Sequence, residues 1–353
     1  MSALPRDLVI WASSAVDANL RQLGYQISVL PKYEVVNSYG KSLLWSPLHH
    51  RLQQFAAVFT IFGPLYARKL AGVNITGFAQ AWIIYPNNEL YAEMSFTQQI
   101  LTKLKFKLQS LFFARADQFV VELEHVKAGL LQQGITNSNA VHVVNNCLSS
   151  LYLTPSSWQS LAVPEAPGKI KLGFVGRNYL HKNTRIFPAI INELRDKYGL
   201  QTCIYVTFTD EEWAACSQAF RADVINVGPL FVAQCPTFYN AMDAVVFPSL
   251  LESFSATPLE ALAMKKPLFA SDRPFNRDIC QEYAYYFDPL SPQSAACAIA
   301  RVFSGSRESN NDFLAAAKEH ALNFSTAKLR AERYLALLMQ ASNMTSNESK
   351  KGH

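Results

Sequence analysis

The sequence has few cysteines, and none of them forms the close pairs that bind metals or exchange electrons. The six are Cys147, Cys203, Cys216, Cys235, Cys280 and Cys297. Without a C-x-x-C pair, the spacing argues against a zinc site and against a disulfide framework. We therefore expect reduced thiols that mostly pack in the core, and we predict no metal site.

Long hydrophobic runs are also missing. The longest candidate, residues 55–67, is interrupted by Gly63-Pro64, and a membrane span needs about 18 uninterrupted apolar residues. The N-terminal MSALPRDLVIWAS places a proline and an Arg-Asp pair before a short apolar run, unlike a signal peptide. These absences predict a cytoplasmic protein.

The sequence also lacks a large excess of charge of either sign. Lys plus Arg exceeds Asp plus Glu by only 32 − 27 = 5, and charged residues make up 17% of the chain. A positive surplus this small suits an anionic small molecule or an anionic membrane surface better than a nucleic acid. We therefore predict no nucleic-acid partner.

What the chain does have is length and apolar content. Its 353 residues are 50% hydrophobic, which is enough for two domains with sizeable cores. Short apolar runs alternate with helical segments, a pattern typical of parallel sheets covered by helices on both faces. The expected strands are 8–12, 27–30, 57–62, 75–79, 118–122 and 141–144, then 170–175, 202–208, 224–227, 244–247, 267–270 and 285–287.

A stretch rich in Ser, Pro and Gln, residues 149–169, predicts the boundary between the two halves. We expect one domain over residues 1–160 and a second over 161–310. A long helical pattern, Asp312 to Gln340, then predicts a helix over 311–341 that returns to the first domain. We expect the polar tail, 342–353, to be disordered.

The most informative segment is ESFSATPLE, from Glu252 to Glu260, which lies between a strand-like run and a helix. A turn of small residues that opens a helix presents free N–H groups and the positive end of a dipole to an anion. The same residues also fit a capping box with Thr257 as N-cap, Pro258 first in the helix and Glu260 third. Both interpretations remain open at this stage.

A second candidate segment opens the second half, where Gly173-Phe-Val-Gly176 is followed by Arg177 and Lys182. One interpretation is a clamp in which the arginine forms bidentate hydrogen bonds to a diphosphate and the lysine adds a point charge. The other is an ordinary loop with two solvated cations. His181 lies between them, and we expect it to be an exposed loop histidine.

In their order and spacing these motifs resemble the retaining GT-B glycosyltransferases of family 4. The resemblance continues through Val227-Gly-Pro-Leu, Ala244-Val-Val-Phe-Pro-Ser and Pro267-Leu-Phe-Ala-Ser-Asp, and it covers essentially the whole second half. It implies an α/β protein with two Rossmann-like domains across a cleft, the first binding an acceptor and the second a nucleotide sugar. It further implies a retaining, metal-independent hexosyltransferase without a cofactor.

The resemblance also implies roles for individual residues. The catalytic set would be Arg177, Lys182 and Glu252, with Glu252 on the transferred sugar and the two cations on the donor diphosphate. Glu260 would hold the ribose. The other donor-binding residues would be Gly176, Phe254, Ser255, Ala256 and Thr257, although the family usually has glycines where this chain has Ser253 and Ser255.

The first half departs from the family. Its first glycine is Gly24, and no Gly-Gly pair occurs anywhere, so the N-terminal strand with its glycine-rich loop is either absent or replaced. A histidine common in the family is also absent from the segment Ile75 to Trp82. Gln80, Trp82 and Asn87 are our candidates for the acceptor site; a packed strand end and a surface loop are the alternatives.

A basic amphipathic segment, Thr97 to Arg115, predicts either a helix that covers the core or a peripheral contact with an anionic membrane. We expect a glycan or lipid-linked acceptor in surface-polysaccharide synthesis, at the inner face of the membrane. Two alternatives remain: an impaired nucleotide-sugar-binding or scaffold protein, and another GT-B enzyme such as an epimerase or phosphorylase.

Overall fold

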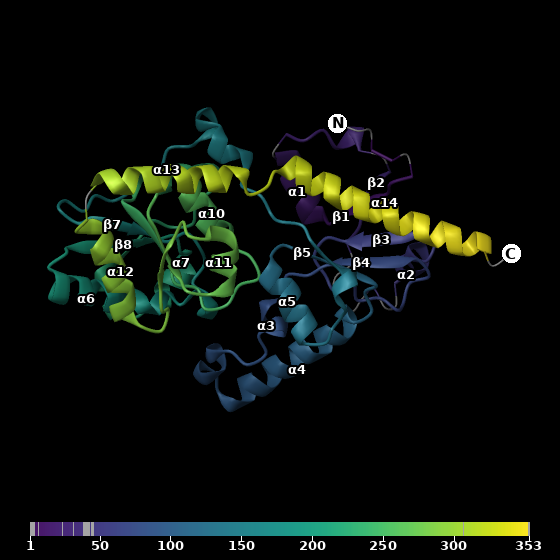
Figure 1. The fold of residues 1–353 in the computed structure, drawn as a ribbon, viewed down its shortest axis with the longest axis horizontal. Helices are drawn as coiled ribbons and strands as arrows, with labels where there is room; N and C mark the ends of the chain where they lie inside the picture. Colours follow the sequence, from purple (N-terminus) through teal and green to yellow (C-terminus); the bar gives the residue numbers. More distant parts are fainter. Residues whose placement is uncertain are drawn as a thin grey trace.

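The computed structural model describes residues 4–5, 7–22, 24–30, 32–37, 43, 46–305 and 307–351. The chain forms two lobes joined by a linker and by a C-terminal helix that returns from one lobe to the other (Figure 1). Each lobe is built on a parallel sheet with helices against it, which confirms the expected α/β fold.

The N-terminal lobe contains a four-stranded sheet in the order β3 (Ala57–Thr60), β4 (Val73–Gly77), β5 (Gln118–Val121) and β6 (Val141–Val143). These strands confirm four of the expected runs, and β4, β5 and β6 each contain buried residues, whereas β3 is partly buried throughout. The accompanying helices are α2 (Leu48–Leu52), α3 (Ala81–Ile84), α4 (Phe96–Phe113) and α5 (Glu124–Gln132).

The N-terminus forms a separate unit, because β1 (Ile10–Ala12) pairs in parallel only with β2 (Tyr33–Val35). Within the described residues, neither strand joins the four-stranded sheet. β1 leads through Ser13 directly into α1 (Ser14–Gln22), without a glycine-rich loop. The strand expected at 27–30 is wrong: Ile27–Val29 is a 3-10 turn, and the strand lies at Tyr33–Val35. The apolar run is only four residues long and ends at a proline, so its pattern alone does not decide between a strand and a turn.

The C-terminal lobe contains a six-stranded sheet in the order β12-β11-β10-β7-β8-β9. The order reverses between β7 (Ile170–Gly173) and β10 (Ala244–Phe247), which are neighbours in space. This is the switch point of a doubly wound sheet, where ligands bind beyond the carboxyl ends of the strands. The other strands are β8 (Thr202–Val206), β9 (Val224–Asn226), β11 (Leu268–Ser271) and β12 (Tyr285–Phe287).

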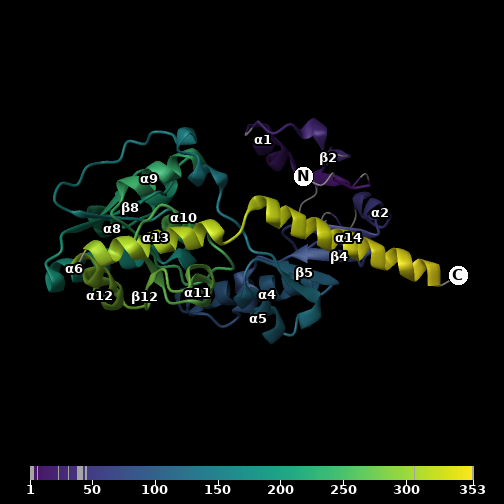
Figure 2. The same ribbon diagram turned by 45° about the horizontal axis from the view of Figure 1, so that its top comes forward.

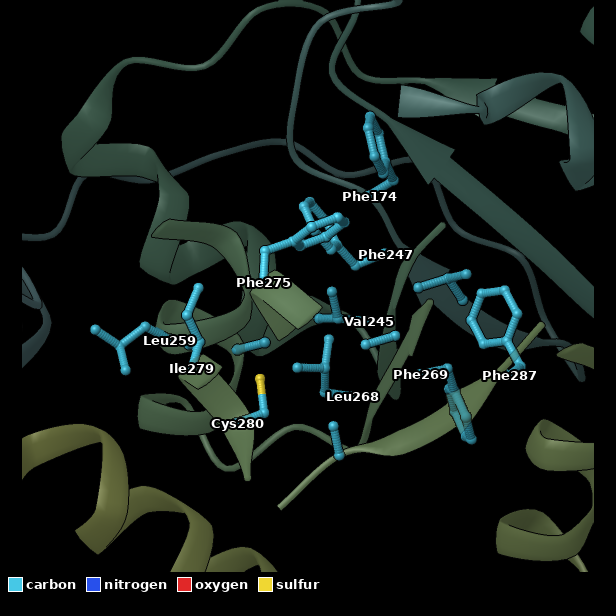
Figure 3. Close-up of a cluster of buried hydrophobic side chains, with 14 of the residues drawn as sticks. Phe174, Val245, Phe247, Leu259, Leu268, Phe269, Phe275, Ile279, Cys280 and Phe287 are labelled. Carbon is cyan, nitrogen blue, oxygen red and sulfur yellow. The ribbon is translucent and has the colours of Figure 1, made fainter. Parts of the chain in front are cut away.

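The helices of this lobe cover both faces of its sheet. They are α6 (Phe187–Tyr198), α7 (Asp210–Ala214), α8 (Gln218–Asp223), α9 (Cys235–Ala241), α10 (Ala256–Ala263), α11 (Pro274–Cys280), α12 (Pro292–Phe303) and α13 (Arg307–Asn323). Figure 3 shows how the strands and helices pack, with Val245 and Leu268 beside Leu259 of α10 and Ile279 of α11. All four residues of β10 are buried, so the strand that carries the loop to Glu252 is fixed in the core.

The C-terminal segment is two helices rather than the single one we expected. α13 ends at Asn323 and α14 (Ala327–Lys351) begins after Thr326, whose Oγ1 accepts the N–H of Leu329 at 3.1 Å. α13 lies on the C-terminal lobe, and α14 crosses to the other lobe (Figures 1 and 2). There Tyr334, Leu337 and Leu338 pack against β3, β4 and β5.

α14 also continues beyond residue 341. Its backbone is helical to Lys351, where we expected a disordered tail from residue 342. The sequence from 327 to 351 contains neither glycine nor proline, so nothing in it ends the helix before Gly352. Among the described residues, no helix is both long and apolar enough to cross a membrane.

Candidate functional site

The candidate site lies at the switch point of the C-terminal lobe, where the loops after β7 and β10 meet. Thr257, in the first turn of α10, donates its hydroxyl to the carbonyl of Val175 at 3.2 Å. On the other side of the site, the N–H of Leu250 donates to the carbonyl of His181 at 2.8 Å. These two bonds hold the loops together, although they are far apart in the sequence.

Lys182 and Glu252 form the charged centre of the site. The Lys182 ammonium lies 2.6 Å from Glu252 Oε1, and the two side chains are only 14% and 10% exposed. His181 Nε2 lies 4.0 Å from the same oxygen. Burial lowers the pKa of His181 more than Glu252 raises it, so the imidazole is neutral near pH 7. We expected an exposed loop histidine here, but the structure places it in the charged cluster.

The position of Lys182 is set by the residue that follows it. Asn183 has φ 55°, and asparagine tolerates this left-handed conformation better than most residues. Its buried amide donates to the carbonyl of Pro289 at 2.8 Å, so the turn is held by the neighbouring loop after β12. The sequence offered no signal for this support, because Pro289 is distant in the chain.

Arg177 has a different partner from Lys182. Its Nε lies 2.8 Å from Oε1 of Glu212 on α7, and the same oxygen accepts the N–H of Asn178 at 3.2 Å. Burial opposes ionisation of Glu212, but the hydrogen bonds from Arg177, Thr209 and Asn178 lower its pKa overall. Half of the Arg177 side chain is exposed to solvent. Glu212 therefore organises the loop after β7, a function that the sequence did not indicate.

Gly173 and Gly176 allow this loop to run close to its neighbours. The N–H of Gly176 donates to Thr207 Oγ1 at 3.1 Å, which ties it to the end of β8. A Cβ at Gly173 would lie 2.6 Å from the Met242 side chain. A larger residue at Gly173 would therefore push β7 away from α9 and move the loop.

The segment ESFSATPLE forms a helix start, but not the capping box. α10 begins at Ala256 with Ser255 as its N-cap, and the Ser255 side chain makes no capping hydrogen bond. Thr257 is the second residue of the helix, and its hydroxyl bonds the carbonyl of Val175 in the other loop instead of capping the helix. Ser255 and Thr257 are buried, Phe254 is partly buried and Ala256 is exposed. The first N–H groups of a helix have no intrahelical partners, so this end of α10 can donate hydrogen bonds to a ligand.

Glu260 lies in the middle of α10, and its Oε2 accepts the hydroxyl of Tyr239 on α9 at 2.8 Å. Burial raises the pKa of Glu260, and the bonds from tyrosine hydroxyls only partly offset this. Burial and the nearby Glu260 charge together raise the pKa of Tyr239 well above its usual value. Glu260 is therefore held in place by Tyr239 rather than by a capping box.

The three acceptor candidates lie on or near α3 and differ in their packing and exposure. Trp82 stacks on Phe106 of α4, with ring centroids 5.5 Å apart. Gln80 precedes α3 and its side chain makes no capping bond, while Asn87 is exposed in the following turn. The apolar cluster that includes Trp82 also contains Leu250 and Leu251 from the loop after β10. The α3 region therefore adjoins the loop that carries Glu252.

Ion pairs between the lobes surround this contact. Glu89 pairs with Arg273 and Glu93 pairs with Arg185, so both acids of the turn after α3 face cations of the C-terminal lobe. Asp278 on α11 accepts both the backbone N–H of His125, at 2.7 Å, and its Nδ1, at 3.0 Å. The sequence could not have revealed these pairs, because none of the partners share a motif.

A separate cavity of about 450 Å³ lies in the N-terminal lobe between α5, β6 and α14. Its lining includes Lys127, His142 and Arg333, and it contains none of the candidate site residues. The charged groups of the candidate site converge at the switch point instead.

Comparison with known proteins finds similarity in the same part of the chain. Residues 169–304 match the family model of the glycosyl transferases group 1. The matched stretch contains both loops of the candidate site and excludes the N-terminal lobe. Within a shorter segment of 119 residues, the chain is 30% identical to the lipopolysaccharide core biosynthesis mannosyltransferase LpcC of Rhizobium leguminosarum bv. viciae. That alignment spans 32% of this chain and 34% of the relative.

Solved structures resemble the whole chain. A glycosyltransferase from Rickettsia africae has a TM-score of 0.65 at 15% identity, over 94% of this chain and 89% of that one. Anabaena HepE, solved with UDP and glucose, has a TM-score of 0.62 at 14% identity, over 92% and 89%. At such identities the likeness shows the fold, which is the two-lobed arrangement of GT-B glycosyltransferases.

Proposed function

We propose that this protein is a glycosyltransferase that moves a sugar from a nucleoside-diphosphate sugar to an acceptor. The observation that carries the proposal is the convergence of Lys182, Glu252 and the start of α10 at the switch point of the C-terminal lobe. A cation and a helix N-terminus are the groups that a diphosphate needs. The group 1 match over residues 169–304 supports the same assignment.

In this proposal the donor lies across the two loops. Lys182 and Arg177 bind the diphosphate, with Gly176 and the backbone of Phe254, Ser255, Ala256 and Thr257 beside the distal phosphate. Glu260 binds the ribose hydroxyls through the carboxylate that Tyr239 positions. Glu252 binds the sugar that is transferred. In the structure without ligand Glu252 holds Lys182, so binding requires the donor phosphate to share this lysine.

The chemistry follows from charge development on the leaving group. The bond between the anomeric carbon and the phosphate oxygen breaks, and negative charge grows on the diphosphate. Lys182, Arg177 and the start of α10 stabilise that charge, commonly the largest catalytic term. The acceptor hydroxyl then attacks from the same face, forms the new glycosidic bond and gives its proton to the leaving phosphate oxygen. We propose that this route retains the anomeric configuration and uses no metal.

We further propose a glycan or lipid-linked acceptor in the synthesis of surface polysaccharide. The relative LpcC is a mannosyltransferase of lipopolysaccharide core biosynthesis, and this supports the class of acceptor. The region around Gln80, Trp82 and Asn87 is our proposed acceptor side, because its apolar cluster adjoins Leu250 and Leu251 of the loop that leads to Glu252.

Purified protein incubated with UDP-, GDP-, ADP- and dTDP-sugars tests the proposal, with truncated lipopolysaccharide cores and a polyprenyl-diphosphate glycan as acceptor probes. We expect one donor to release nucleotide in proportion to product, only when an acceptor is present. NMR of the product should show the anomeric configuration of the donor. Absence of binding by every nucleotide sugar would contradict the proposal.

One observation favours a second candidate, a nucleotide-sugar-binding or scaffold protein. Within the described residues β1 and β2 stand outside the four-stranded sheet, and no glycine-rich loop follows β1. The same experiment separates the candidates. Binding without nucleotide release under any acceptor supports the scaffold, and conversion of the donor without an acceptor supports an epimerase or phosphorylase.

A further inference from the structure

α4 presents an apolar face to solvent that the core does not use. Six large apolar side chains of this helix are exposed, among them Phe96 at 77% and Leu104 at 60%. The six are Phe96, Ile100, Leu101, Leu104, Leu108 and Leu111. Their spacing follows the helical period, so they share one continuous face. Figure 1 shows α4 along the lower edge of the N-terminal lobe.

A different face of the same helix makes the core contacts. Phe113 is buried and Phe106 stacks on Trp82, both on the side of the helix away from the exposed face, and Phe112 is buried at the C-terminal end of the helix. Phe113 also packs beside Phe78 at the centre of the lobe, with ring centroids 4.6 Å apart. The helix is therefore anchored by its inner face, and its outer apolar side chains are exposed to solvent.

The charges around the outer face all have one sign. Lys103, Lys105 and Lys107 are exposed, and no Asp or Glu occurs between Glu93 and Asp117. By the helical period, Lys105 flanks the apolar face on one side and Lys103 on the other, while Lys107 falls at the edge of the face between Phe96 and Ile100. An apolar face with lysines on both sides is the pattern of a helix that lies in a membrane interface.

We propose that α4 docks this protein onto an anionic lipid bilayer. The apolar side chains enter the boundary between headgroups and acyl chains, and the lysines reach the lipid phosphates. A second copy of the chain fits this face less well, because pairing two such faces would bring like charges together. The surface lies outside the donor site, so this inference stands or fails independently of the proposed function.

Docking through α4 would also orient the site. α4 begins at Phe96, three residues after Glu93, whose carboxylate pairs with Arg185 of the other lobe. The contact between the lobes and the proposed acceptor region therefore lie near the docked end of the helix. This geometry suits an acceptor that is itself held in the membrane.

Vesicle co-sedimentation of the full chain tests the proposal, with phosphatidylcholine vesicles and with mixed phosphatidylcholine–phosphatidylglycerol vesicles. We expect binding to the anionic vesicles that weakens with salt, and much weaker binding to the neutral ones. The combined Leu101→Ser, Leu104→Ser and Leu108→Ser variant should lose about tenfold or more of the partitioning. The matched control is Leu153→Ser with Phe231→Ser and Val232→Ser, which removes exposed apolar residues elsewhere.

Charge is tested in the same way. Lys103→Gln, Lys105→Gln and Lys107→Gln together should lower anionic partitioning about tenfold or more. Lys169→Gln, Lys197→Gln and Lys328→Gln change the net charge equally on other elements and should leave partitioning almost unchanged. Equal partitioning of the α4 variants and their controls would overturn the proposal. So would absence of vesicle binding, or dimers that depend on the α4 side chains.

Discussion

The ammonium nitrogen of Lys182 lies 2.6 Å from Oε1 of Glu252, and both side chains are largely buried. The lysine comes from the loop after β7 and the glutamate from the loop after β10, which are the two strands at the switch point of the sheet. In the absence of a ligand, the carboxylate of Glu252 therefore balances the charge of the Lys182 ammonium in the site. A diphosphate at this place would compete with Glu252 for Lys182.

The Lys182–Glu252 pair should be strongly coupled in stability. Lys182→Met leaves the Glu252 carboxylate without a partner, and we expect a loss of about 3 kcal/mol in the free energy of unfolding. The double variant with Glu252→Gln should recover most of this loss, because no charge is left unpaired. Denaturant unfolding of both single variants and the double variant measures the coupling. Additive effects would mean that the pair is not formed in solution.

Glu252→Gln should separate binding from turnover. The neutral amide no longer balances Lys182, so affinity for a nucleoside diphosphate should rise about threefold to tenfold. Turnover should fall at least about a hundredfold, because the carboxylate that contacts the transferred sugar is lost. Glu282→Gln, at an exposed position, is the control. A parallel fall in affinity and turnover would contradict the proposed position of Glu252.

Glu212 should act on the donor through Arg177 and Asn178 rather than by direct contact. Glu212→Ala removes the hydrogen bonds to Arg177 and Asn178. Part of the binding free energy must then be used to order the loop. We therefore expect KM for the donor to rise about tenfold with little change in kcat. Glu212→Gln can still accept the N–H of Asn178 and should retain most of the affinity. Glu211→Ala, the neighbour on α7, should behave as wild type. An unchanged KM in Glu212→Ala would disprove this positioning role.

Glu260 should make stability depend on pH. Burial raises its pKa in the folded protein, so the folded state holds the proton to a higher pH than the unfolded chain. At a pH above the folded pKa, the buried carboxylate is charged and lowers the free energy of unfolding by its full amount. At a pH below the unfolded pKa, the group is protonated in both states and this loss vanishes. Glu260→Gln, without ligand, should therefore be more stable than wild type at pH 8, with a difference that shrinks as the pH falls. Thermal unfolding across this range measures it, and a difference independent of pH contradicts the assignment.

The sequence predicted the sheet of the C-terminal lobe well, because its strands are short and largely apolar runs. Ala244–Phe247 and Tyr285–Phe287 have the expected bounds. Pro248 ends the apolar run of the first of these strands. The N-terminal unit was predicted less well, because a four-residue apolar run cannot distinguish a strand from a 3-10 turn.

Errors at the site came from contacts between distant segments. Thr257 fits a local cap, but the carbonyl of Val175 competes for its hydroxyl, and no local pattern reveals that carbonyl. Likewise, the sequence placed Arg177 and Lys182 in one clamp but did not predict that Glu212 and Glu252 would each hold one of them. The break between α13 and α14 was missed because the helical pattern continues on both sides of Ser325-Thr326. Neither glycine nor proline marks the break.

The most direct test of the account is the thermal shift caused by nucleotide sugars in wild type, Lys182→Met and Lys169→Met. A ligand raises stability by about RT ln(1 + [L]/Kd), so the correct donor among UDP-, GDP-, ADP- and dTDP-sugars should stand out. We predict that wild type and the exposed control Lys169→Met shift equally. Lys182→Met and the double variant with Glu252→Gln should not shift from their own unliganded melting temperatures. A full shift in both Lys182 variants would contradict a donor site at the meeting point of the two loops.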